Sequence, residues 1–137
     1  MKYYLEQTGR EVPETIPNDV SDQLFIRIME KLGVEQCYRC PDYSAKQLAE
    51  DLHTNSRYLS RAIATHTNGN YTSLVNAFRL REARRMLRSA RFRKHTVEEI
   101  GLLCGYSSRQ AFYLAFRREE GMSPGEYREG AQSSENG

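Results

Sequence analysis

The sequence has no apolar run long enough to cross a membrane, since its longest such stretch, residues 100–106, already contains two glycines. A spanning helix needs about 18 or more apolar residues, and the first residues of the chain also lack the apolar core of a secretion signal. Cysteine is scarce, with 3 residues in 137. An odd cysteine count without a secretion signal excludes a disulfide scaffold, so we expect a cytoplasmic protein that contacts no membrane.

Strict alternation of apolar and polar residues, the mark of a half-buried strand, is also absent. Apolar residues instead recur every three or four positions between turn signals, which predicts an all-α fold of about seven helices. We expect residues 1–20 to be a linker or arm and residues 130–137 to be a disordered tail. Residues 21–129 form the domain, with a first unit at about 21–70, a connecting helix at about 72–88 and a second unit at about 96–129.

Particular residues predict the helix ends. The expected N-caps are Ser44, Thr96 and either Ser107 or Ser108, because a hydroxyl oxygen at this position accepts a hydrogen bond from a free backbone N–H. We expect Gly33 to stop the first helix. After Gly121, proline at the first helical position starts a last short turn over residues 123–127.

The sequence contains an internal repeat of a short helix, a turn and a longer helix. Leu48-Ala49-x-x-Leu52 is followed by Leu59 and Ile63, and Ile100-Gly101-x-x-Cys104 is followed by Phe112 and Phe116 at an offset of 52 to 53 residues. This order is typical of the helix-turn-helix motif, whose second helix enters the major groove of DNA. Ala49 and Gly101 would lie where the two helices of each unit cross.

Charge is distributed unevenly along the chain. Residues 54–118 carry 13 Lys and Arg against 3 Asp and Glu, whereas the segments on both sides are acidic. Of the 13 basic residues, 12 are arginine, whose planar fork suits phosphate and guanine edges better than lysine does. A basic central block between acidic ends predicts a surface for a polyanion.

The outward faces of the two longer helices indicate which side chains would meet DNA. Arg57, Ser60 and Arg61 share one stripe, and Arg109, Gln110, Tyr113 and Arg117 share the other, with no acid in either stripe. Arginine reads guanine and glutamine reads adenine through paired hydrogen bonds. The connecting helix would be roughly 25 Å long, which suits recognition helices about one DNA turn apart. The expected phosphate contacts are Ser44, Asn55, Arg79, Arg84, Arg88, Ser107, Ser108 and Arg117.

These patterns resemble the AraC/XylS family of bacterial transcription regulators over about residues 21–128. The most specific features lie in the second unit: the turn Gly105-Tyr-Ser107, the pair Phe112-x-x-x-Phe116 and the ending Gly121-Met-Ser-Pro-x-x-Tyr-Arg128. The first unit adds Asn55-Ser-Arg-Tyr-Leu-Ser-Arg61, and the connecting helix adds Phe78-Arg-Leu-Arg-Glu-Ala83.

The resemblance implies sequence-specific binding of double-stranded DNA, usually with activation of transcription through RNA polymerase. It places the base-reading positions on Arg57, Ser60 and Arg61 in the first unit, and on Arg109, Gln110, Tyr113 and Leu114 in the second. The chain departs from the family pattern at three positions. Leu114 stands where arginine is common, His53 replaces a turn glycine and Gly101 replaces a more usual alanine.

Two other kinds of function remain open from the sequence. A protein-interaction adaptor would keep the fold without reading an operator, and Leu114 is the feature that favours it. An enzyme or metal protein would depend on Cys37-Tyr-Arg-Cys40. A zinc site would need further ligands at zinc-finger spacing, and the sequence does not supply them. A redox motif of this type usually occurs in a βαβ unit, which is missing here. We therefore expect a nucleoid-associated regulator without catalysis, metal or cofactor. It would bind DNA as a monomer unless a missing domain dimerises it, either as a stand-alone regulator or as the output domain of a longer one.

Overall fold

The computed structural model describes residues 20–136, and every regular element in that range is helical. The α-helices are α1 Val20–Met29, α2 Ala45–Asp51, α3 Ser56–Thr67, α4 Tyr71–Arg88, α5 Val97–Leu103, α6 Arg109–Glu120 and α7 Pro124–Asn136. Short helical turns lie between them: the π-turn η2 Glu30–Val34 and the 3₁₀ turns η3 Cys37–Arg39 and η4 Ala90–Phe92. The prediction of an all-α fold with about seven helices is therefore confirmed.

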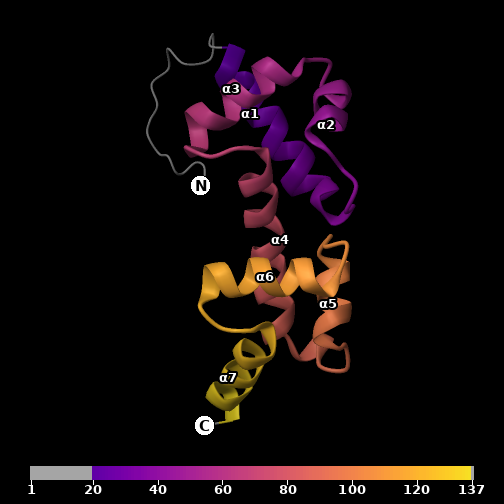
Figure 1. Ribbon diagram of the computed structural model, residues 1–137, viewed down its shortest axis with the longest axis vertical. Coiled ribbons are helices and arrows are strands. Elements are labelled where there is room, and N and C mark those ends of the chain that lie inside the picture. Colours follow the sequence, from indigo (N-terminus) through magenta and orange to yellow (C-terminus); the bar gives the residue numbers. More distant parts are fainter. Residues whose placement is uncertain (1–19, 137) are drawn as a thin grey trace.

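The first unit consists of α1, α2 and α3, which pack together at one end of the molecule (Figure 1). Ile28 and Leu32 from α1 and η2 are fully buried against Leu48 of α2 and against Leu59 and Ile63 of α3. Leu48, Leu59 and Ile63 lie on the inner faces that the repeat predicted. Burial of this cluster leaves the opposite side of α3 facing solvent.

The second unit packs α5, α6 and α7 around the other end of α4. Phe112 and Phe116 of α6 are fully buried together with Ile100 and Cys104 of α5. Gly101 lies where the helices cross, because a Cβ built there would be 2.4 Å from the ring of Phe112. The inner faces of α5 and α6 therefore agree with the sequence pattern, and the absence of a side chain at residue 101 is a packing requirement.

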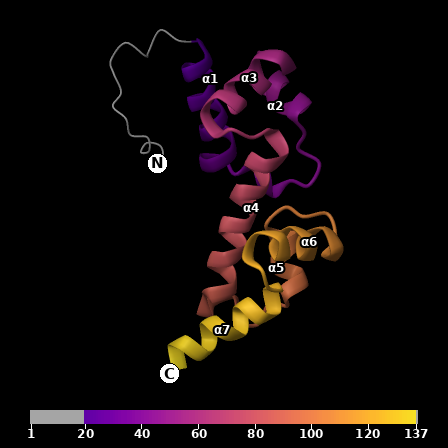
Figure 2. The ribbon, with the colours of Figure 1, turned by 60° about the vertical axis from the view of Figure 1, so that its left-hand side comes forward.

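Helix α4 belongs to both units. Leu74 and Val75 in its first half complete the first core, and Ala83 and Leu87 in its second half complete the second core. In Figure 1, α6 lies across α4, and the turned view in Figure 2 shows the two units at successive levels along the same helix. None of the helices in residues 20–136 combines the length and the apolarity that a membrane crossing requires.

Helix starts follow the caps that the sequence predicted. Oxygen atoms of Ser44, Thr96 and Ser108 accept hydrogen bonds from backbone N–H groups at 3.1, 3.0 and 3.1 Å. Thr96 and Glu99 form a reciprocal capping box, with a second bond of 2.8 Å from the Thr96 N–H to the Glu99 carboxylate. His53 has φ 57° in the turn between α2 and α3, so it adopts the left-handed conformation of the glycine that it replaces.

The first predicted boundary that differs is the stop at Gly33. The helical backbone continues through Gly33 as the turn η2, and this turn ends at Val34. The ring of Phe78 lies beside this turn, and a Cβ at residue 33 would be 3.2 Å from its Cε1 atom. Glycine therefore serves close packing against α4 here, and it does not end the helix.

The C-terminal segment also differs from its prediction. Helix α7 runs to Asn136, where we expected a short turn over residues 123–127 and a disordered tail over 130–137. Ser123 and Glu126 exchange hydrogen bonds of 2.9 and 3.1 Å, which start the helix firmly, and no later proline interrupts it. The arm predicted for residues 1–20 lies outside the described residues, except for Val20, which begins α1.

Candidate nucleic-acid interface

The exposed face of α3 carries the first predicted set of base-reading residues. Arg57, Ser60 and Arg61 are exposed, whereas Leu59 and Ile63 on the opposite face are fully buried. None of the three polar side chains has a hydrogen-bond or ion-pair partner among residues 20–136. Their donors are therefore available to an external acceptor, as major-groove reading requires.

The exposed face of α6 carries the second set. Arg109, Gln110, Leu114 and Arg117 are exposed, and Tyr113 is half-buried. Leu114 is 64% exposed, so it belongs to the outer face and contributes nothing to the core. The structure thus places the predicted base-reading residues on the outer faces of α3 and α6, except Tyr113, which packs partly against the second core.

Glu98 of α5 lies beside this second face, and sequence reasoning missed it. Its Oε2 atom accepts a hydrogen bond of 3.1 Å from the Tyr113 hydroxyl and lies 3.3 Å from Arg109 Nε. The Arg109 guanidinium also lies over the Tyr113 ring, 5.0 Å from its centre. Hydrogen bonds from its own backbone N–H and from Tyr113 lower the pKa of Glu98, so the carboxylate is charged near neutral pH. Eleven residues separate Glu98 from Arg109, so no helical spacing indicated the pair.

Polar caps stand at the N-termini of α2, α3 and α6. The Asn55 side chain accepts a hydrogen bond of 2.8 Å from the Tyr58 N–H, and Ser44 and Ser108 cap their helices in the same way. A serine hydroxyl or asparagine amide that accepts a bond in a cap keeps its own donor. These positions, with exposed Ser107 nearby, therefore combine a free donor with the positive end of a helix, which suits a phosphate oxygen.

The predicted arginines of the connecting helix are already engaged within the protein. Arg84 forms an ion pair of 2.9 Å with Glu120, and Arg88 donates a hydrogen bond of 2.6 Å to the Tyr127 hydroxyl. Arg79 is half-buried, which lowers its pKa, and it donates to backbone carbonyl oxygens. Arg79 therefore serves the fold, in contrast to the phosphate contact that the sequence predicted.

Arg79 lies at a junction between the two units, which we define as Tyr38, Cys40, Arg79, Gly105 and Tyr106. Its Nε and terminal nitrogen donate to the carbonyl oxygens of Tyr38 and Cys40 at 2.8 and 3.1 Å, and its guanidinium lies 5.6 Å from the centre of the Tyr106 ring. Gly105 has φ +111°, and a Cβ there would be 2.1 Å from the Tyr38 carbonyl oxygen. Figures 1 and 2 both show the loop after α1 beside the α5–α6 turn. The junction therefore holds α3 and α6 in one arrangement.

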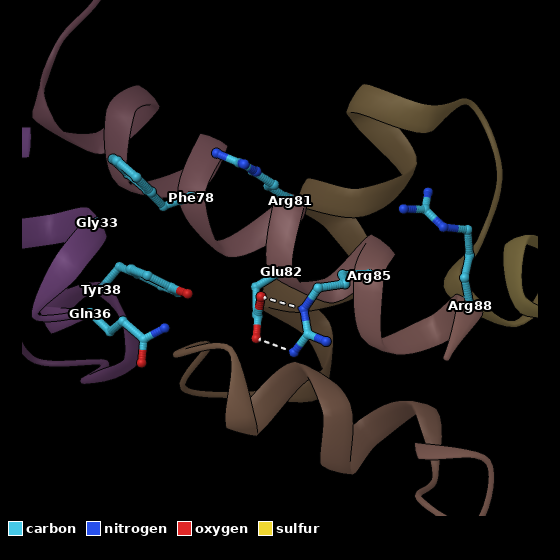
Figure 3. A pocket seen from close by; sticks show the side chains of 8 residues that line it. All are labelled: Gly33, Gln36, Tyr38, Phe78, Arg81, Glu82, Arg85 and Arg88. Atoms are coloured by element: carbon cyan, nitrogen blue, oxygen red, sulfur yellow. Dashed lines mark hydrogen bonds and ion pairs between the residues drawn. The ribbon is translucent and has the colours of Figure 1, made fainter. Parts of the chain in front are cut away.

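A groove of about 510 Å³ lies between the first unit and α4. Figure 3 shows Tyr38 and Phe78 at one end of it and a Glu82–Arg85 pair near its middle. Arg85 binds Glu82 through two hydrogen bonds of 3.0 and 2.8 Å, and the side chain of Arg88 lies apart from this pair. In Figure 3 the side chains of Arg81, Arg85 and Arg88 are spread along the groove and do not converge on one point.

The three cysteines are all free thiols. Cys37 is the first residue of η3 and is half-buried, Cys40 directly follows η3 and is exposed, and Cys104 is buried in the second core. Burial raises the pKa of the Cys104 thiol to about 12, which keeps it protonated. Within residues 20–136, no group of three or more His, Cys, Asp or Glu side chains could hold a metal ion.

Two named proteins are similar to this chain. It is 33% identical over 91 residues to the HTH-type transcriptional activator RhaS of Escherichia fergusonii, an alignment that covers 66% of this chain and 32% of RhaS. It is 26% identical over 109 residues to the xylose operon regulatory protein of Haemophilus influenzae, covering 80% of this chain and 27% of that protein. The chain therefore spans about a third or less of the length of these relatives.

A solved structure shares the fold. The DNA-binding domain of AdpA, in complex with a target DNA, superposes with a TM-score of 0.67 at 22% identity, covering 85% of this chain and 96% of that one. Residues 48–130 match the family described as "Helix-turn-helix domain", and they include α3, α4 and α6. Because that match extends over more than half of the sequence, the chain belongs to the AraC/XylS family of helix-turn-helix transcription regulators.

Proposed function

We propose that this chain binds double-stranded DNA in a sequence-specific way, as a monomer, with α3 and α6 in successive major grooves of one duplex. It acts as a transcription regulator without catalysis or a cofactor. Arg57, Ser60 and Arg61 read one half-site, and Arg109 and Gln110 contribute most of the hydrogen bonds at the other. Leu114 contacts the groove through its apolar surface, for example at a thymine methyl group.

One observation carries the proposal: both predicted reading faces are exposed, and a shared helix and a fixed junction hold them together. The known complex of AdpA with its target DNA supports it, because that domain shares this fold. The basic segment 54–118, with 13 Lys and Arg against 3 acids, adds the sequence-independent attraction that every DNA-binding surface needs.

The proposed regulatory role extends to transcription activation through RNA polymerase, since RhaS is itself named an activator. An in vitro transcription assay tests activation, on a promoter that carries a DNA sequence selected by this protein from a random pool. We expect the intact chain to increase transcript yield. A decrease on the same template would instead identify a repressor, without affecting the proposal that the chain binds DNA.

Selection of bound sequences from a random duplex pool tests DNA reading directly. Wild-type protein should select two short motifs about one helical turn apart. Arg61→Ala should relax base preference in one motif about tenfold, because a bidentate arginine–guanine pair contributes about 1–3 kcal/mol of discrimination. Leu114→Arg should add preference in the other motif without unfolding the protein, since residue 114 is exposed.

Arg93→Ala is a charge-matched control, because Arg93 is exposed in the connection between α4 and α5, outside both reading helices. This variant should select the wild-type motifs. No binding of any duplex at low salt would overturn the proposal and favour the protein-interaction adaptor. An unchanged motif with Arg61→Ala would show that α3 does not read bases.

A further inference from the structure

The two recognition faces differ in one charged neighbour. Glu98 in α5 contacts the second face, whereas the position 52 residues earlier, in α2 of the first unit, is Lys46. An acidic side chain beside a DNA-reading surface repels phosphates, so it weakens binding to every duplex. Because Lys46 stands at the matching position of the first unit, the acid at residue 98 is particular to the second face, which points to a specific task there.

The contacts of Glu98 define how Arg109 is held. The Glu98 carboxylate forms an ion pair with Arg109, with 3.3 Å between Glu98 Oε2 and Arg109 Nε. The Arg109 guanidinium lies over the Tyr113 ring, 5.0 Å from the ring centre. The same carboxylate oxygen accepts the Tyr113 hydroxyl at 3.1 Å, so the acid, the ring and the guanidinium form one cluster. Both terminal nitrogens of Arg109 have no partner among residues 20–136.

This arrangement matches what guanine reading requires. Guanine presents O6 and N7 as two acceptors in the major groove, and a guanidinium meets them with two parallel N–H donors. An arginine has many rotamers, and restricting them before binding lowers the entropy lost in the complex. A carboxylate on Nε leaves the two terminal nitrogens as the free pair.

We propose that Glu98 is a positioning residue that holds Arg109 with its two terminal nitrogens ready for a guanine O6/N7 edge, and so sets the guanine preference of the second half-site. The inference rests on the proposed function of α6 as a reading helix. Glu98 thereby lowers affinity for DNA in general and raises discrimination. The first unit, with Lys46 at the matching position, lacks this device.

The test is Glu98→Gln in the full chain, with Glu99→Gln as the matched control. Both changes remove one negative charge from α5, and glutamine at residue 99 can still complete the capping box with Thr96. Glu98→Gln should reduce guanine preference at one position of the second motif by about three- to tenfold. The same variant should bind scrambled duplex more tightly than wild type, because a charge that repels phosphate is gone. Glu99→Gln should leave both motifs unchanged.

A measurement on the free protein separates this inference from the proposed function. The Nε–H resonance of Arg109 should show restricted motion in wild type and greater mobility in Glu98→Gln. In an Arg109→Ala background, Glu98→Gln should change the motif no further. An unchanged second motif and an unchanged Arg109 resonance in Glu98→Gln would overturn the role of Glu98. Failure of wild type to select any motif would overturn the proposed function, while the Arg109 resonance would still report on the contact.

Discussion

Phe112 and Phe116 carry much of the packing in the second unit. Both rings are fully buried and meet edge to face, with ring centres 5.8 Å apart and an interplanar angle of 71°. Phe112 also covers Gly101, so these two rings hold α6 against α5. Because Phe112 and Phe116 are buried on one side of α6, the residues on its opposite side face solvent.

Truncation of either ring should therefore destabilise the protein strongly. Phe112→Ala and Phe116→Ala should each lower the free energy of unfolding by about 3–5 kcal/mol, through lost burial and the cavity that remains. Chemical denaturation followed by circular dichroism measures this change. Leu114→Ala is the control on the same helix and should change stability by less than about 0.5 kcal/mol. A loss below about 1 kcal/mol for the phenylalanines would mean that the inner and outer faces are reversed.

At the level of elements, the α2–α3 turn depends on one unusual residue. His53 is exposed and has φ 57°, a conformation that costs a residue with a Cβ about 1–2 kcal/mol relative to glycine. The hydrogen bond of 2.9 Å from the Thr54 N–H to the Ala49 carbonyl oxygen closes the turn. The chain therefore tolerates local strain to set the angle between α2 and α3.

Relief of this strain is measurable. His53→Gly should raise the free energy of unfolding by about 0.5–1 kcal/mol, because the gain at positive φ exceeds the entropy that glycine adds to the unfolded chain. His53→Val should destabilise the protein, since a β-branched residue is least tolerant of this conformation. Thermal unfolding of the three proteins under one buffer condition ranks them. If glycine at residue 53 proves destabilising, the turn does not hold a left-handed residue in solution.

At the scale of the whole molecule, the junction contacts join the first unit, α4 and the α5–α6 turn, and so constrain how α3 and α6 lie relative to each other. Gly105 permits the backbone of the α5–α6 turn to touch the Tyr38 carbonyl, and Arg79 ties the same carbonyl to α4. A second bond joins the Tyr106 hydroxyl to the Asn76 side chain at 2.9 Å. These contacts connect the first unit, α4 and the second unit directly to one another.

Disruption of the junction should change tolerance of half-site spacing more than base preference. Gly105→Ala should lower the free energy of unfolding by about 2–4 kcal/mol, because of strain at positive φ and the clash with the Tyr38 carbonyl. Arg79→Lys is a milder variant that keeps the charge and loses the forked contact to two carbonyls. Competition between sites that differ by one inserted base pair is the measurement, and Arg79→Lys should reduce wild-type discrimination severalfold. Equal discrimination by both proteins would show that α4 alone sets the spacing.

The salt dependence of binding reports the electrostatics of the whole surface. If about 6–8 phosphates are neutralised, log affinity should fall with log salt concentration at a slope of about −5 to −7. Arg117→Ala, which removes an exposed arginine whose side chain forms no hydrogen bond or ion pair in residues 20–136, should make the slope shallower by about one unit. Arg84→Ala should change it less, because Arg84 is already paired with Glu120. A wild-type slope shallower than about −2 would contradict binding across two grooves.

The sequence by itself determined most of the helices and their buried faces, but neither the end of the first helix nor the length of α7. Caps such as Thr96 and the left-handed turn at His53 depend on a few neighbouring residues, and the burial of Phe112 follows from a helical period. Such signals are local, so a single sequence is enough to read them. For the same reason the exposed positions of the predicted reading residues, Arg61 and Leu114 among them, were predictable.

Only the tertiary structure decided which distant groups meet. Arg79 is the residue type expected to contact a phosphate, yet it is half-buried at the junction because α4 passes beside the Tyr38 carbonyl. Glu98 looks like a surface acid of a short helix, yet the crossing of α5 and α6 brings it to Arg109. The partner of a long charged side chain depends on how helices pack, and no local pattern encodes that geometry.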